Sequence, residues 1–230
     1  MRDFIPCCAL PAFAARVMYF LFAALLAALV ATFPAWAQQK AAAERSSTPA
    51  RETASAELLP ELRKGGYVLY FRHVATDFSR NDEKMKDFDD CANQRNLIDK
   101  GRAQARAIGA AIRELGIPVR RVLASPFCRT VETAQLVFGH SEKMPEVRGG
   151  PAAPEDPARY ADLRKLMSAR VEAGTNLVIV SHGNPFFSVA GPPYLAEGEA
   201  AVIRPTGSGF EVIARVRVQG WEALLQAAKR

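Results

Sequence analysis

The sequence predicts an α/β fold with three layers, α/β/α, built around a mainly parallel sheet. Three observations lead to this prediction. Short apolar runs of strand length alternate with stretches of helical periodicity. The run Asn176–Val180 is continuous and rich in β-branched residues, as expected for a central strand buried on both faces. Near the C-terminus two alternating segments flank Pro205–Gly209, which is typical of a hairpin.

The first half of the domain contains three predicted helices and two predicted strands. A helix over 56–64 ends at a Gly-Gly pair, and the apolar run 67–71 follows as a strand. Residues 74–100 form a polar segment without periodicity, and a loop of that length in a compact domain is usually functional. Apolar residues at three- and four-residue spacing predict a helix over 101–115. The strand 121–124 and a helix over 129–138 complete this half.

The second half begins with Pro145–Val147, which we expect to be a short edge strand, and with the loop Gly149–Pro157. A helix over 158–173 places its leucines and Met167 inward, and the strand 176–180 follows. The hairpin strands are 200–204 and 210–218, and an amphipathic helix over 221–228 closes the domain.

Polar residues follow three of these strands. Arg72 and His73 come directly after the first strand, Arg129 lies just after the second, and His182 follows Asn176–Val180 with one serine between. Parallel sheets bind ligands beyond the carboxyl ends of their strands, so these side chains should meet at one edge. The sequence therefore predicts a single site assembled from distant segments.

These residue types suit phosphoryl chemistry. The guanidiniums of Arg72 and Arg129 are fixed forks of donors that match a phosphate or a carboxylate. A neutral imidazole between them can attack phosphorus and carry the phosphoryl group, and a second, protonated imidazole can neutralise charge on its oxygens. We expect no cofactor, and the three histidines and the cysteines lack the spacing of metal ligands.

The N-terminal residues predict export. An uncharged apolar stretch, Val17–Phe33, lies between Arg16 and the sequence Ala35-Trp36-Ala37, the arrangement of a secretory signal peptide. We therefore expect residues 1–37 to be a signal peptide cleaved after Ala37, residues 38–55 to be a disordered linker, and residues 56–230 to be the folded domain. The predicted location is the periplasm or the extracellular medium. An uncleaved signal that anchors the protein in a membrane is the alternative.

Removal of the signal changes the cysteine count and the charge. Only Cys91 and Cys128 remain, and in an oxidising compartment we expect them to form a disulfide, with two unpaired thiols as the alternative. Loss of two arginines and one aspartate lowers the net charge from +6 to +5. This excess is spread along the chain, so nucleic acid is not the indicated partner; a small phosphorylated molecule is. The oligomeric state stays open.

Four motifs together resemble one known family. They are Leu69–His73, Asn96-Leu97 with Gly101–Ala105, Ser125–Ala134 and Val180–Gly183, in the order found in the histidine phosphatase superfamily, whose fold is phosphoglycerate mutase-like. The resemblance covers residues 60–218. It implies that His73 is the phosphorylated nucleophile and that Arg72, Arg129 and His182 form the phosphate pocket. Thr76 stands where many members have a small polar residue near the phosphate.

The proton donor to the leaving group does not follow from the resemblance. The family usually has glycine after the first histidine, where this chain has Val74. One branch carries a glutamate just after an apolar–Arg pair, where this chain has Gly149, and the other carries an aspartate where this chain has Gly183. Asp77 is the candidate general acid by position, with Glu155 and Asp156 as further carboxylates in loops.

We therefore expect an exported phosphatase that hydrolyses phosphomonoesters through a phosphohistidine intermediate. Members without a clear acid resemble those that act on good leaving groups such as phosphohistidine. Exported members of the family include lipopolysaccharide-core heptose phosphatases, so a phosphosugar of the envelope is the implied substrate. The alternative is a phosphate- or phosphosugar-binding module that has lost turnover.

Overall fold

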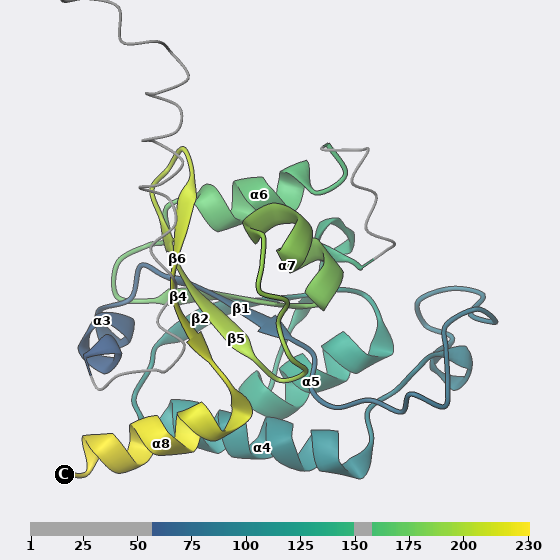
Figure 1. Cartoon of the computed structure of the whole chain (residues 1–230), viewed down its shortest axis with the longest axis horizontal. Coiled ribbons are helices and arrows are strands. Elements are labelled where there is room, and N and C mark those ends of the chain that lie inside the picture. The colour runs from purple at the N-terminus through teal and green to yellow at the C-terminus, as the bar shows by residue number, and fades with distance from the viewer. Residues whose placement is uncertain (1–56, 150–157) are drawn as a thin grey trace, which may run out of the picture. The chain divides into compact units, whose positions relative to one another are not determined.

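The computed structural model describes residues 57–149 and 158–230, which fold around a six-stranded sheet (Figure 1). The predicted signal peptide and linker lie outside these ranges, as do Glu155 and Asp156. The strands are β1 (Val68–Arg72), β2 (Val119–Ala124), β3 (Glu142–Lys143), β4 (Asn176–Ser181), β5 (Ala200–Pro205) and β6 (Phe210–Val216). Their order is β3-β2-β4-β1-β5-β6, in which β5 pairs antiparallel with both β1 and β6 and the other pairings are parallel. The mainly parallel sheet with a C-terminal hairpin is confirmed.

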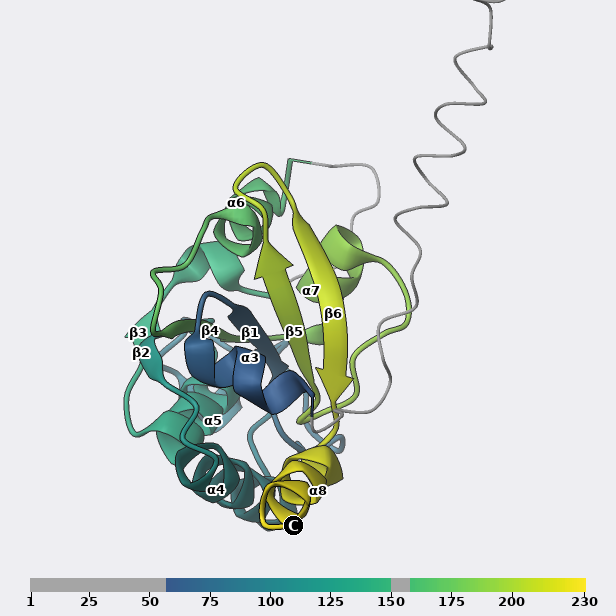
Figure 2. The same cartoon turned by 90° about the vertical axis from the view of Figure 1, so that its left-hand side faces the viewer.

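Helices cover both faces of the sheet (Figures 1 and 2). Alternate residues of β1 point to opposite faces, as the pleat requires. Leu69 and Phe71 pack in the cluster that contains the buried residues of α3 (Leu58–Lys64), α4 (Asp99–Glu114), α5 (Cys128–Phe138) and α8 (Val218–Ala228). Val68 and Tyr70 pack in the cluster that contains those of α6 (Ala161–Ser168) and α7 (Gly183–Ala190). This is the predicted α/β/α arrangement.

The edge strand predicted at Pro145–Val147 is wrong. These residues form a 3₁₀ helix, η2 (Pro145–Val147), and the edge strand is β3, where Glu142 pairs with Leu123 of β2. Proline has no N–H to donate to a sheet but suits the first position of a helix. The N–H of Val147 instead donates to the carbonyl of Met144 at 3.2 Å.

The largest differences from the predicted helices are at α6 and α7. The helix predicted over 158–173 is confined to α6, because the chain is extended at Ala169 and Ala173 forms a bridge with Gly65. The sequence analysis assigned no helix to α7, whose first turn contains Pro185 and whose buried residues include Phe186 and Val189. Proline is tolerated in a first turn, so α7 forms immediately after β4.

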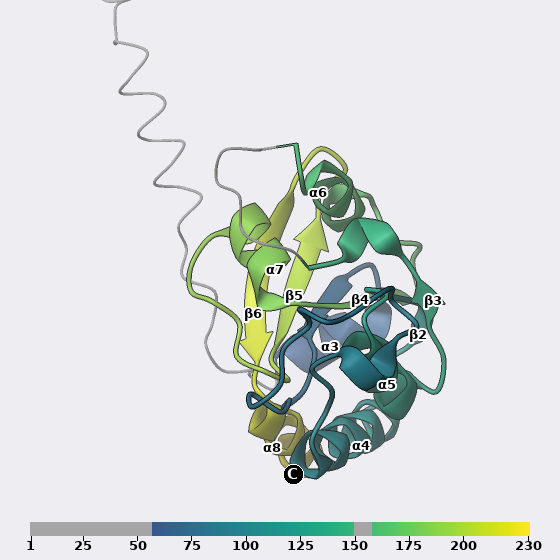
Figure 3. The ribbon, with the colours of Figure 1, turned by 90° about the vertical axis from the view of Figure 1, so that its right-hand side faces the viewer.

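The carboxyl ends of β1, β2 and β4 lie at one edge of the sheet, since Arg72 pairs with Ser181 and Ala124 pairs with Val180. The long segment 73–98 starts at this edge and crosses in front of the sheet in Figure 3. Apart from the 3₁₀ helix η1 (Cys91–Asn93), it contains no helix and pairs only through a bridge between Thr76 and Leu97. It is therefore the loop that the sequence predicts.

A disulfide joins Cys91 of this segment to Cys128, the first residue of α5, with the Cα atoms 5.7 Å apart. The predicted pairing is confirmed. The N–H of Cys128 also donates to Oε1 of Gln94 at 2.9 Å, so a covalent and a polar link hold the long segment against α5. Within the described ranges, no helix is long and apolar enough to cross a membrane.

Candidate active site

His73 is the first residue after β1 and is 1% exposed. Its N–H donates to the carbonyl of Ser181 at 3.0 Å, and its own carbonyl accepts from the N–H of Gly198 at 2.9 Å. The side-chain Nδ1 lies 2.9 Å from the carbonyl oxygen of Val74. A carbonyl can only accept, so Nδ1 carries the ring proton and Nε2 keeps its lone pair. The backbone therefore orients an imidazole whose free nitrogen can act as a nucleophile.

His182 is the second histidine at this edge, directly after β4 and at the N-terminus of α7. Its ring lies edge-to-face with that of His73, with centroids 5.5 Å apart. Nε2 is hydrogen bonded to Oγ of Ser125 at 2.8 Å, and the backbone carbonyl accepts from the hydroxyl of Tyr70 at 2.8 Å. The structure thus brings together the two histidines that the sequence places 109 residues apart.

Arg72 and Arg129 complete the predicted constellation. Arg72 donates to the carbonyl of Leu195 at 2.8 Å, and its guanidinium lies 5.2 Å from the ring centre of Tyr194. Arg129 is buried and donates to Oδ1 of Asp82 at 3.0 Å. The Nε atoms of both arginines are buried and lack a hydrogen-bond partner among the described residues. Buried donors are rarely left unpaired, so these atoms point to an anion that the pocket is built to bind.

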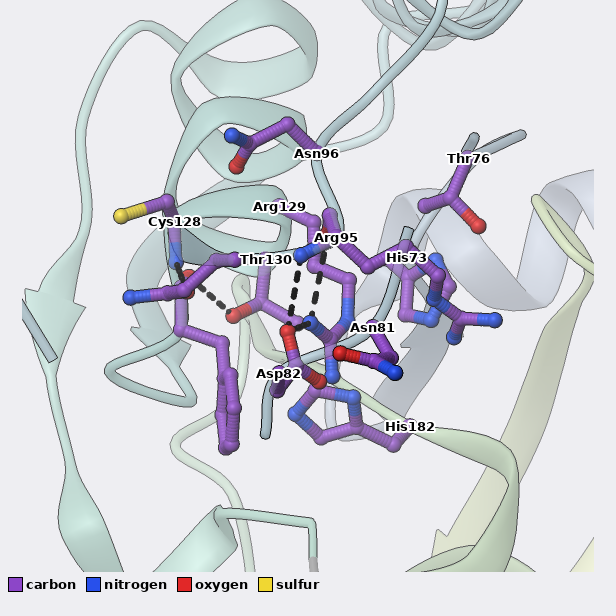
Figure 4. Close-up of polar contacts among 12 residues, drawn as sticks. His73, Thr76, Asn81, Asp82, Arg95, Asn96, Cys128, Arg129, Thr130 and His182 are labelled. Carbon is purple, nitrogen blue, oxygen red and sulfur yellow. Dashed lines mark hydrogen bonds and ion pairs between the residues drawn. The ribbon is translucent and has the colours of Figure 1, made fainter. Parts of the chain in front are cut away.

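Three further charged residues line the site, and sequence reasoning missed them. Arg95 and Asp82 come from the long segment, and Figure 4 shows them beside Arg129 and the two histidines. Oδ1 of Asp82 also accepts from the N–H of Arg95 at 2.8 Å. Glu197 precedes β5, with Oε1 3.8 Å from Nδ1 of His73. Arg95 adjoins the Asn96-Leu97 motif, which could have revealed it, whereas nothing in the sequence around Glu197 indicates its contact with His73.

Burial and positive charge act together on the histidines. Burial holds the pKa of His73 well below its ordinary value; the hydrogen bond to Val74 opposes this shift, and the charges of Arg129, Arg72 and Arg95 reinforce it. Burial, then the charges of His73 and the same arginines, also hold the pKa of His182 well below its ordinary value. Both rings are therefore neutral at pH 7. The positive charge expected on His182 requires the added negative charge of a bound phosphoryl group.

Thr76 and Asp77 follow His73 along the chain but differ in their surroundings. The hydroxyl of Thr76 is buried and donates to Oε1 of Glu197 at 2.6 Å. Oδ1 of Asp77 accepts from the hydroxyl and the N–H of Ser79, at 2.6 and 3.0 Å, and these hydrogen bonds lower the pKa of Asp77. A carboxyl whose pKa is lowered is rarely protonated near neutral pH and so has no proton to give, which does not favour Asp77 as a general acid.

Glycines occupy both positions where a general acid would be expected. A Cβ atom on Gly149 would lie 2.7 Å from Cδ2 of His182, and one on Gly183 would lie 2.2 Å from the ring of Tyr194. The Tyr194 ring stays in that place because its hydroxyl donates to Oδ1 of Asn184 at 2.7 Å. Neighbouring rings therefore fill the space that a side chain would need at these two positions. Among the described residues, no group of three or more His, Cys, Asp or Glu side chains could hold a metal ion.

Comparisons with known proteins find one matching family model and several solved structures. Residues 68–150 match the model of the histidine phosphatase superfamily (branch 1). Solved structures with a similar fold include the protein histidine phosphatase SixA complexed with tungstate (16% identity, 66% of this chain and 97% of that chain, TM-score 0.47). Others are YhfR of Bacillus stearothermophilus (16%, 64% and 95%, TM-score 0.45) and a phosphoglycerate mutase of Bacillus anthracis (12%, 71% and 99%, TM-score 0.49). Likeness at this level says nothing about individual residues. No curated protein sequence matches the chain.

Proposed function

We propose that this chain, whose residues 68–150 match the histidine phosphatase superfamily, is a phosphatase that hydrolyses phosphomonoesters through a phosphorylated His73. One observation carries the proposal. His73 is buried and its pKa is held low. Its Nδ1 is hydrogen bonded to the carbonyl oxygen of Val74, and its Nε2 makes no hydrogen bond with any described residue. A neutral imidazole fixed in this way beside two arginines is prepared to attack an anionic phosphoryl group.

In the first step the lone pair of His73 Nε2 forms a bond to phosphorus while the bond from phosphorus to the leaving oxygen breaks. The bonding electrons go to the leaving oxygen, which takes a proton as it departs. The ring now carries the phosphoryl group on Nε2 and a proton on Nδ1, and so gains a positive charge. In the second step water attacks phosphorus, the N–P electrons return to Nε2, and inorganic phosphate leaves. Arg72, Arg129 and His182 are the groups we assign to the phosphoryl oxygens in both steps.

No residue of this chain is assigned as the donor of the proton that the leaving oxygen takes. Gly149 and Gly183 supply no carboxyl, and the pKa of Asp77 is lowered by Ser79. Water can then protonate the leaving group, which is efficient only when the leaving group is already stable. We therefore infer a substrate with a good leaving group, such as a phosphosugar with an acidic hydroxyl or a phosphorylated nitrogen.

Hydrolysis of p-nitrophenyl phosphate tests the proposal. We expect turnover that resists a chelator, is inhibited by vanadate, and is lost in His73→Ala, with an acid-labile phosphate trapped on the wild-type protein. His140→Ala is the matched control, because His140 is exposed and its Nδ1 contacts only the carbonyl of Phe138 among the described residues. Full activity in His73→Ala would rule out the phosphohistidine mechanism.

A phosphate-binding module without turnover is the second candidate, and the glycines at positions 149 and 183 favour it. The same assay separates the two. If the wild-type protein binds phosphate but hydrolyses none of a panel of aryl, sugar and nitrogen-linked phosphates, the binding module is correct.

We further propose that the protein works outside the cytoplasm, on a phosphorylated envelope component. The apolar stretch before Ala37 and the disulfide between Cys91 and Cys128 support this location. Expression of the full chain in a Gram-negative host should yield a periplasmic protein whose N-terminal residue is Gln38. A membrane-bound protein that retains residue 1 would instead support the uncleaved anchor.

A further inference from the structure

Glu197 is the carboxylate that the structure places beside the proposed nucleophile. It lies in the connection between α7 and β5, outside the motifs that the sequence analysis identified. Two backbone hydrogen bonds hold this connection against the end of β1. The N–H of Gly198 donates to the carbonyl of His73 at 2.9 Å, and the N–H of Arg72 donates to the carbonyl of Glu199 at 3.0 Å. The position of Glu197 relative to His73 is therefore set by the backbone.

The side chain of Glu197 is also held in place. Its Oε1 accepts the hydroxyl of Thr76 at 2.6 Å and lies 3.7 Å from the guanidinium of Arg72, and the side chain is 16% exposed. The same oxygen is 3.8 Å from Nδ1 of His73, which is too long for a hydrogen bond but short for two charges with little water between them. Since Nδ1 already donates to Val74, Glu197 acts on the ring through its charge.

The geometry does not suit Glu197 to protonate the leaving group. In a phosphoryl transfer the attacking and leaving atoms stand roughly in line on opposite sides of phosphorus. The leaving oxygen is therefore beyond the phosphoryl group from Nε2, whereas Glu197 flanks the Nδ1 side of the ring. Glu197 can instead stabilise the positive charge that the ring gains when Nε2 bonds to phosphorus. The positive charges of Arg72, Arg95 and Arg129 around the ring disfavour that charge, so a nearby carboxylate offsets them.

We propose that Glu197 is a positioning residue for His73: its carboxylate stabilises the positive charge that the imidazole carries in the transition states for formation and breakdown of the phosphohistidine, and so speeds both steps. This inference rests on the proposed phosphatase function. The competing role is structural, in which Glu197 only holds Thr76 and Arg72 in the pocket.

The two roles predict different effects of a substitution at Glu197 on the binding of inorganic phosphate. Glu197→Gln keeps an oxygen that can accept from Thr76 but removes the charge. If Glu197 acts on the charged ring, kcat for p-nitrophenyl phosphate should fall about tenfold while the inhibition constant of inorganic phosphate stays within about twofold. Vanadate, which bonds to the histidine nitrogen as the transition state does, should bind about tenfold more weakly. Glu197→Asp keeps the charge at a greater distance from the ring, so its kcat and its affinity for vanadate should lie between those of the wild type and those of Glu197→Gln.

Glu211→Gln is the control for the loss of one negative charge, because Glu211 pairs with Arg204 on the exposed part of the hairpin. It should retain wild-type constants. If Glu197→Gln loses phosphate affinity by the same factor as it loses kcat, the structural role is correct and the proposal is wrong. If kcat and the affinities for phosphate and vanadate all equal those of the wild type, Glu197 has neither role and the proposal is also wrong. If the wild-type protein hydrolyses no phosphate ester, the proposed function fails separately. The comparison of vanadate with phosphate binding then still decides the role of Glu197.

Discussion

Asp82 accepts a hydrogen bond from the guanidinium of Arg129, the group that we expect to hold phosphate. Its Oδ1 accepts from Arg129 at 3.0 Å and from the N–H of Arg95 at 2.8 Å, and Asp82 remains partly exposed. An anionic substrate must compete with this carboxylate for Arg129. Asp82 therefore competes with an anionic substrate for Arg129, and it balances the buried charge of Arg129 when no substrate is bound.

Substitution of Asp82 tests this competition. Asp82→Asn keeps an oxygen that can accept from both donors but removes the negative charge. We expect inorganic phosphate to inhibit the variant at severalfold lower concentration than the wild type. Glu83→Gln, an exposed neighbour on the same segment, should leave the inhibition constant unchanged. Weaker phosphate binding in Asp82→Asn would mean that the aspartate organises the pocket instead of competing for it.

Arg95, on the same segment as Asp82, affects the pKa of both histidines. Its charge lowers the pKa of both His73 and His182, and its guanidinium lies 4.7 Å from the ring centre of Phe78. In Arg95→Met the pKa of both histidines should rise, because a positive neighbour that disfavoured protonation is removed. We expect kcat/KM to fall, and the loss of activity toward acidic pH to begin at a higher pH than in the wild type. A pH–rate profile measures both effects. An unmoved acidic limb would mean that Arg95 does not act on the histidines.

At the scale of the element, the segment 73–98 carries Asp82 and Arg95 and is tied to α5 next to Arg129. The disulfide closes a loop across a sequence separation of 37 residues. Chain-entropy models assign such a bridge about 4 kcal/mol of stability.

Removal of the bridge should affect stability and phosphate binding together. We expect Cys91→Ala/Cys128→Ala to lower the melting temperature by about 10 °C and to raise KM, since Arg95 and Asp82 lose their fixed place beside Arg129. Melting curves and steady-state kinetics measure the two effects. A reductant should have the same effects on the wild type and none on the variant. A KM equal to that of the wild type would show that Gln94 alone suffices to hold the segment.

The sequence predicted the elements of this fold better than the contacts between them. Apolar periodicity locates β1, β2 and β4, and their shared direction brings His73, Arg129 and His182 to one edge. The edge strand was misplaced because Pro145 cannot donate to a sheet, and α7 was missed because its first turn contains proline. Glu197 and Asp82 could not be predicted as site residues, because their place depends on how two connections without periodicity pack against the sheet.

At the scale of the whole molecule, the buried histidines link the site to stability. The unfolded chain binds protons at His73 and His182 below a pH of about 6.5, whereas the folded pocket, with both pKa values lowered, does not. The unfolded state therefore binds more protons in this range, and the free energy of unfolding falls as the pH falls.

Urea unfolding at pH 7.0 and pH 5.0 measures this linkage. We expect the wild type to lose about 2 kcal/mol per buried histidine between the two conditions. His182→Gln should lose less, because one of the two proton-binding groups is gone from the unfolded chain. Equal losses in the two proteins would contradict the pKa shift assigned to His182.

The ring of Tyr194 also bears on how this site could change over evolutionary time. A side chain at position 183 must displace that ring, which gives up its hydrogen bond to Asn184 and its contact with Arg72. Gly183→Asp alone therefore disturbs Arg72, which we propose binds phosphate, before the new carboxyl can serve as an acid. A change of Tyr194 to a small residue would have to come first. The two substitutions are epistatic, and the order in which they arise decides whether a lineage can acquire a general acid at this position.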